Sequence, residues 1–260
     1  MRRTALALGA VLTVTLTGAC SDDTTGSAPL FSDARSLADA ASAATVAGHS
    51  AKFTTDVAAG TLVSHGQGQA KFAADGTSLV MTTDYIGEPL ELRLVARQLY
   101  AKVPDGSRDQ VTDGKPWVKV SPDGSDPFSQ VLGGSLAQLA EQNDPARTLA
   151  QVRTAGTLKS GERTQLDGTG AEHYRVDVDL AKLGSELPAG LPPGTVTPGT
   201  KVPLDLWLDA ADRPLQLVLD LSPILSGSDG ARITARYSGW GSPVDVQAPA
   251  ADQVGALVGG

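Results

Sequence analysis

The chain has 260 residues, with 29 acidic and 21 basic side chains and a net charge of −8 at neutral pH. An acidic surface argues against a nucleic-acid partner and against electrostatic binding of anionic lipid head groups. Because the chain holds one cysteine, it forms no internal disulfide, and packing has to stabilise the fold. Its length suits one sizeable domain.

The first twenty residues predict export and attachment to a lipid. Two arginines, a short apolar segment over residues 5–16 and small residues at 17–19 precede Cys20. The layout is typical of a secretory signal, and its apolar part is shorter than the ~20 residues that span a bilayer. The letters Leu-Thr-Gly-Ala-Cys also fit a bacterial lipobox, whose cysteine is acylated and becomes the mature N-terminus.

We therefore expect a signal peptide over residues 1–19 and a lipid anchor at Cys20, on the outer face of the cell membrane. A plain signal peptide with an incidental thiol is the alternative. Removing residues 1–19 removes two arginines and no acid, which leaves a net charge of −10. Residues 20–30 are small and polar and predict a flexible tether.

A helix and a series of strands are expected next. Ser32-Asp33 is typical of a helix start, and Gly48 of a helix end. From residue 50 apolar side chains alternate with polar ones, which favours strands. The short turns between them predict an antiparallel meander, and the acidic stretch 104–116 a surface loop. The expected strands cover residues 50–57, 62–72, 78–84, 90–95, 99–103 and 117–120.

A helical block follows, over residues 126–139 and from Asp144-Pro145 onwards. Gly184–Pro203 is rich in proline and glycine and predicts a loop or flap, and residues 250–260 a disordered tail. Alternation resumes in strands over residues 157–159, 173–180, 202–208, 215–221 and 231–237.

The order of elements predicts one domain over residues 31–249, with an α+β fold. We expect a curved antiparallel half-barrel sheet with helices on its concave face.

No residue pattern indicates catalysis or a bound cofactor. The three histidines, His49, His65 and His173, lie far apart and are expected on strand faces or at the surface. No pair of histidines or cysteines has the spacing of zinc ligands, and Gly133 to Ala137 lacks the second glycine of a nucleophile elbow. We therefore expect a protein that is not an enzyme and has no metal or cofactor.

Apolar side chains recur at every second position of the expected strands. They form either an ordinary core under the helices or a concave face that accepts acyl chains, and composition fits both interpretations. The candidate cavity-lining residues are Phe53, Leu79, Met81, Leu90, Leu92 and Leu94.

Several stretches resemble the LppX/LprAFG type of actinobacterial lipoprotein. They are Leu99-Tyr100-Ala101, the segment Lys115–Val120, the hairpin that begins with Val202–Leu208, and the ending from Tyr237 to Val246. The resemblance spans nearly the whole mature chain. It implies a LolA/LolB-like fold whose sheet and helices enclose a hydrophobic cavity.

The resemblance also implies binding or transfer of envelope lipids in that cavity. The expected partners are an acyl-chain lipid or glycolipid, the membrane through the N-terminal anchor, and an envelope transport protein, with no nucleic acid. The alternative function is that of a protein-interaction or sensor lipoprotein with a filled core.

Overall fold

The computed structural model describes residues 29–59, 62–85, 88–121, 143–184, 187, 196–224 and 231–257. The expected signal peptide, Cys20, most of the tether, the helical stretch 126–139 and much of the loop 184–203 lie outside these ranges. Within the described ranges, no helix is both long enough and apolar enough to span a membrane.

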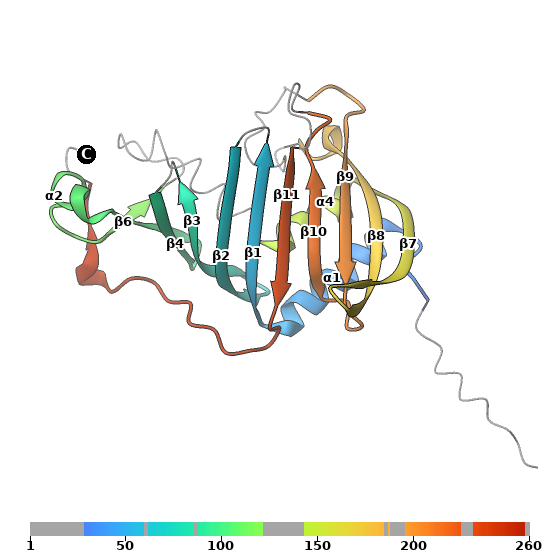
Figure 1. The fold of residues 1–260 in the computed structure, drawn as a ribbon, viewed down its shortest axis with the longest axis horizontal. Helices are drawn as coiled ribbons and strands as arrows, with labels where there is room; N and C mark the ends of the chain where they lie inside the picture. The colour runs from blue at the N-terminus through green and yellow to red at the C-terminus, as the bar shows by residue number, and fades with distance from the viewer. Residues whose placement is uncertain are drawn as a thin grey trace, which may run out of the picture.

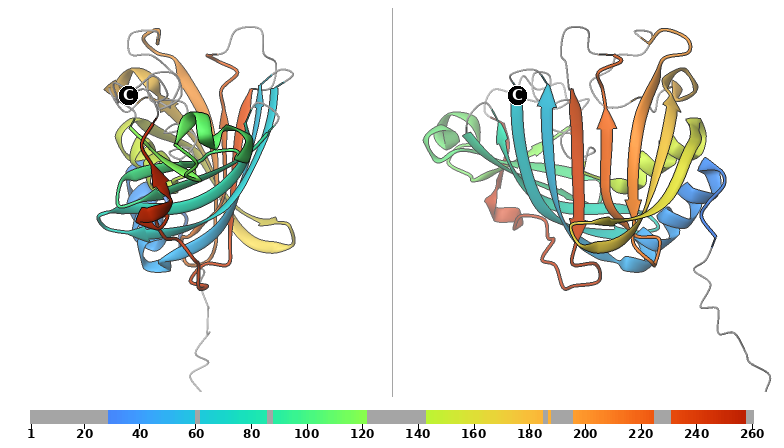
Figure 2. Two further views of the ribbon diagram at one scale, coloured as in Figure 1. Left: turned by 90° about the vertical axis from the view of Figure 1, so that its left-hand side faces the viewer. Right: turned by 45° about the vertical axis from the view of Figure 1, so that its right-hand side comes forward.

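The described strands form one curved sheet of twelve strands (Figures 1 and 2). Their order is β12-β6-β5-β4-β3-β2-β1-β11-β10-β9-β8-β7. Two meanders, β1 to β6 and β7 to β11, join where β1 pairs antiparallel with β11. The strands are β1 (Ser50–Ala59), β2 (Leu62–Ala73), β3 (Gly76–Tyr85), β4 (Glu88–Val95), β5 (Gln98–Lys102), β6 (Trp117–Val120), β7 (Gly156–Leu166), β8 (Thr169–Asp179), β9 (Lys201–Leu208), β10 (Pro214–Asp220), β11 (Arg232–Ser238) and β12 (Val254–Gly255).

Two helices, α1 (Ala34–Gly48) and α4 (Pro145–Ala155), pack against each other on one face of this sheet. They lie behind the strands in Figure 1. We call the face that they cover the inner face and the opposite one the outer face. The predicted α+β fold with a single curved sheet is thereby confirmed.

Both helices begin at an aspartate. Asp144 caps α4 by accepting a hydrogen bond from the backbone N–H of Ala146 at 3.0 Å, and Pro145 occupies the first helical position, as predicted. At α1 the cap is Asp33 and not Ser32, because the Asp33 carboxylate accepts the backbone N–H of Ser36 at 2.9 Å.

Two segments predicted to be irregular are partly regular. The acidic loop 104–116 contains the 3-10 turn η1 (Asp105–Ser107) and the short helix α2 (Arg108–Val111). The tail predicted to be disordered over residues 250–260 forms the turn η5 (Ala251–Gln253) and then β12.

Strand β12 pairs parallel with β6, so the sheet is not wholly antiparallel. Lys115 Nζ also donates a hydrogen bond to the carbonyl of Asp252 at 2.8 Å. The C-terminal segment is ordered because β6 would otherwise present open backbone groups at the edge of the sheet. The remaining 3-10 turn, η3 (Leu180–Lys182), follows β8.

Candidate functional site

The register of the strands arranges inner-face side chains in four parallel rows, because directly paired residues point to the same face. The first row is Ala51, Ala70, Leu79, Leu94, Leu99 and Val120, and the second is Tyr237, Phe53, Gly68, Met81, Leu92, Ala101 and Val118. The third row is Tyr174, Leu206, Leu217, Ala235, Thr55, Gly66, Thr83 and Leu90, and the fourth is Val176, Leu204, Leu219, Ile233, Val57 and Ser64.

All six sequence-predicted lining residues lie on this inner face, in the first three rows. Leu79 and Leu92 are fully buried, and Phe53 and Met81 are 3% and 2% exposed. Leu90 and Leu94 are half-buried and pack against the core. The structure therefore brings the six together, as parts of a face that is closely covered at its centre.

Two glycines make room for the larger predicted residues. A Cβ atom on Gly68 would lie 2.6 Å from Cζ of Phe53, and one on Gly66 would lie 3.3 Å from Cε of Met81. Both side chains thus occupy the space that the missing side chains leave. The predicted cavity is therefore not seen between these side chains and the two glycines.

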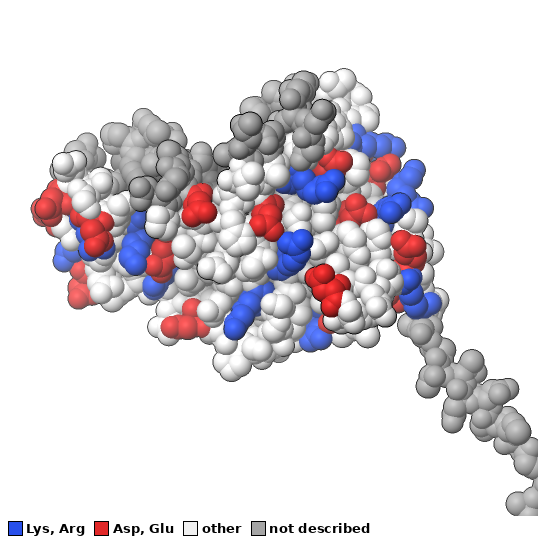
Figure 3. All heavy atoms as spheres, viewed as in Figure 1, with Lys and Arg blue, Asp and Glu red and all other residues white. Residues whose placement is uncertain are grey.

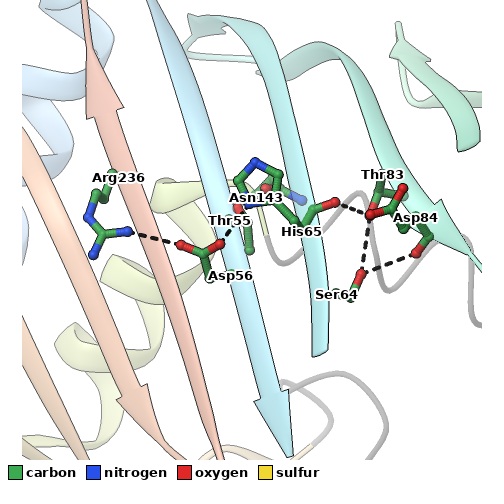
Figure 4. A network of polar contacts seen from close by, with 8 residues as sticks. All are labelled: Thr55, Asp56, Ser64, His65, Thr83, Asp84, Asn143 and Arg236. Atoms are coloured by element: carbon green, nitrogen blue, oxygen red, sulfur yellow. Dashed lines mark hydrogen bonds and ion pairs between the residues drawn. The ribbon is translucent and has the colours of Figure 1, made fainter. Parts of the chain in front are cut away.

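A polar cluster of Thr55, Ser64, Thr83 and Asn143 interrupts the apolar face (Figure 4). Thr55 Oγ1 donates a hydrogen bond to Oδ1 of Asn143, whose Nδ2 lies 3.5 Å from Sδ of Met81. Thr83 Oγ1 donates to the carbonyl of His65 at 3.2 Å. Sequence reasoning missed Asn143, because nothing local shows that the residue before a helix cap lies across the sheet.

The outer face of the same strands is charged. Asp56 accepts a hydrogen bond from Nη1 of Arg236 at 3.0 Å and lies 2.7 Å from Nδ1 of His65. The hydrogen bond with His65, followed by the nearby charges, lowers the pKa of Asp56. Figure 3 shows acidic and basic side chains interspersed over this face. A hollow of about 770 Å³ also opens here, with Lys52, Gln67 and Arg236 in its lining.

His173 lies on a strand face, as expected, and is buried there. It is 7% exposed, its ring stacks on Trp207 at a centroid distance of 4.2 Å, and its two nitrogens face Asp205 at 2.7 Å and Glu162 at 3.3 Å. No group of three or more metal-ligating side chains occurs in the part of the chain that the structure describes. His173 is thus a buried histidine with a carboxylate beside each of its ring nitrogens.

Two tyrosines on the inner face differ in how their hydroxyl groups are satisfied. Tyr174 donates to Glu172 Oε2 at 2.6 Å and accepts the backbone N–H of Phe31 at 3.4 Å. The hydroxyl of Tyr237 is buried and has no hydrogen-bond partner among the described residues. Burial raises the pKa of both tyrosines, and a nearby carboxylate, Glu172 or Asp144, raises each further.

The fold and this face define an α+β protein with an open curved sheet, helices on one side and apolar rows beneath them. No family model matches the chain, and no curated protein matches it either.

Solved structures do match. LprF from Mycobacterium bovis has a TM-score of 0.48 and 17% identity over 84% of this chain and 97% of its own. MucB in complex with MucA(peri) has a TM-score of 0.41 and 15% identity, and the match covers 84% of this chain but only 59% of MucB. A DUF1329 family protein from Desulfovibrio piger has a TM-score of 0.31 and 13% identity. LprF bears one of the names of the LppX/LprAFG group. Similarity at this level carries no inference about ligand or partner.

Proposed function

We propose that this chain is an exported lipoprotein, anchored through Cys20 at the outer face of the cell membrane. Its inner face binds an acyl-chain lipid or glycolipid of the cell envelope and catalyses no reaction.

One observation supports this function: the apolar side chains of the inner face continue beyond the part that is closely covered. In the fourth row Leu204 is buried, whereas Leu219, Ile233 and Val57 are only half-buried. Two half-buried residues after β10, Leu221 and Ile224, extend the same apolar surface. A chain-like apolar ligand lying along this surface would gain about 0.8 kcal/mol for each methylene group removed from water.

Native mass spectrometry of the protein without its signal peptide, purified from its own host, tests this proposal. The expected result is a population that carries a co-purifying mass in the range of a lipid. A persistently ligand-free protein that also fails to bind an apolar fluorescent probe would contradict it.

A second function, binding of a protein partner by a filled domain, is favoured by the packing at the centre of the inner face. Leu79 and Leu92 are fully buried there, and Phe53 lies over Gly68. The variant Ile233→Trp separates the two functions, because half-buried Ile233 lies in the fourth row, along which the ligand is proposed to lie. If the face has room for a ligand, tryptophan should block lipid binding with little change in melting temperature. If the face is filled, overpacking should cost about 1–3 kcal/mol.

Cys20→Ala tests the attachment. We expect the variant to be either uncleaved or released from the membrane, because cysteine supplies the sulfur that is acylated. The measurement is fractionation of membranes with mass determination of the chain. A variant that is still processed and still sediments with membranes would show that the lipobox interpretation is wrong.

A further inference from the structure

Tyr237 places a hydroxyl group in the second row of the inner face, between apolar side chains. Tyr237 pairs directly with Phe53 in the second row, and the residue is 4% exposed. The ring of Trp240 lies 6.1 Å away between centroids, so the surroundings of the phenol are mainly apolar. The hydroxyl is nevertheless without a hydrogen-bond partner in the described ranges. Leaving a buried hydroxyl group without a hydrogen bond lowers the free energy of unfolding.

Other polar groups on this face are satisfied. Thr55 bonds to Asn143, Thr83 bonds to the carbonyl of His65, and Tyr174 has both a donor and an acceptor. The fold therefore pairs buried polar atoms where protein partners are within reach. Tyr237 lies on the same face, yet its hydroxyl has no partner among the described residues. It pairs directly with Phe53, which the sequence predicts to line the cavity.

The charges near Tyr237 restrict what can accept its hydrogen bond. The four rows contain no lysine or arginine, so they hold no cation for an ionised head group. The nearby charge that acts on the phenol is the carboxylate of Asp144, which Thr77 holds by a hydrogen bond of 2.9 Å. Burial and this carboxylate raise the pKa of Tyr237, so the phenol stays protonated and remains a donor. A second carboxylate beside Asp144 would be repelled.

We propose that Tyr237 determines specificity on the inner face: its hydroxyl donates a hydrogen bond to a neutral oxygen, such as an ester carbonyl, within an otherwise apolar ligand. This inference rests on the proposed lipid-binding function. It adds that ionised fatty acids are poor ligands, because the carboxylate of Asp144 repels them. Pure hydrocarbons cannot accept the hydrogen bond from Tyr237.

Three probes with the same chain length test the inference: methyl palmitate, palmitate and hexadecane, each competing with a bound apolar fluorophore at pH 8. Wild type should bind methyl palmitate about three- to tenfold more tightly than hexadecane, the range expected for one hydrogen bond, and palmitate should compete least well. Tyr237→Phe should bind methyl palmitate and hexadecane equally. Tyr174→Phe is the matched control, because it removes a hydroxyl that is already paired, and it should keep the preference for the ester.

The preference of wild type among the probes can be measured even if a variant folds poorly. A wild-type protein that binds all three equally, or a Tyr237→Phe variant that keeps the ester preference, overturns the inference and leaves lipid binding intact. A lipid-loaded crystal structure with only an ordered water on the Tyr237 hydroxyl also overturns it. If no probe displaces the fluorophore from wild type, the proposed function and the inference both fail.

Discussion

The inner and outer faces of β1 to β4 carry opposite kinds of side chain, although their residues alternate along the same strands. On the inner face Phe53, Met81 and Leu92 are at most 3% exposed. On the outer face His65 and Asp56 form a hydrogen-bonded pair in which both side chains are about half exposed, at 54% and 46%. The comparison indicates that the inner face supplies most of the free energy of folding, whereas substitutions on the outer face should alter stability little.

The largest expected difference between the faces comes from removing one buried leucine. Leu92→Ala should lower the free energy of unfolding by about 2–5 kcal/mol, because Leu92 is fully buried and the change leaves a cavity. The control is Val80→Ala on the neighbouring strand, where half-buried Val80 is paired with Arg93 on the outer face. Its cost should stay below about 1 kcal/mol. Urea denaturation of both variants checks the prediction, and equal losses would contradict the contrast between the faces.

A smaller effect is expected where α4 meets the inner face. Asp144→Ala removes the helix cap and the hydrogen bond from Thr77, and should cost about 1–2 kcal/mol of unfolding free energy. Asp33→Ala removes the cap of α1, whose carboxylate accepts hydrogen bonds from the neighbouring Ser36, and should cost less because these contacts are local and exposed. Thermal denaturation of the two variants measures the difference. If Asp33→Ala proves the more damaging, the cap of α4 does not help to hold the inner face together.

The smallest effect is expected on the outer face and depends on pH. Because the pKa of Asp56 is lowered in the folded protein, its stabilising contribution is present above the unfolded pKa of about 3.9 and is lost as pH falls through the folded value. Asp56→Asn should therefore lower stability at pH 7 by less than about 1 kcal/mol, since the ion pair is exposed. Urea denaturation between pH 2 and 7 should show the two proteins converging at low pH. A constant gap over that range would assign the effect to something other than the charge.

Much of the fold could be predicted from local patterns. Alternation in β1, β3 and β4 places Phe53, Leu79, Met81, Leu90, Leu92 and Leu94 on one face, and the structure places them there. The pair Asp144-Pro145 predicts the start of α4, and the helix begins there. These signals are local, since a period of two residues or a helix cap needs only neighbouring residues to take effect.

The tertiary structure alone decided which distant segments meet. The pairing of β1 with β11 joins residues about 180 positions apart. The pairing of β12 with β6 joins Val254 to Trp117, and it covers an edge of the sheet that would otherwise be open. No short pattern encodes such partners, because the free energy of these contacts comes from packing after the chain has closed a long loop. The same reason applies to Asn143 over Thr55 and Met81, and to the hydroxyl of Tyr237. The sequence by itself determined which side chains face inwards, and only the tertiary structure decided which of their polar atoms find a partner.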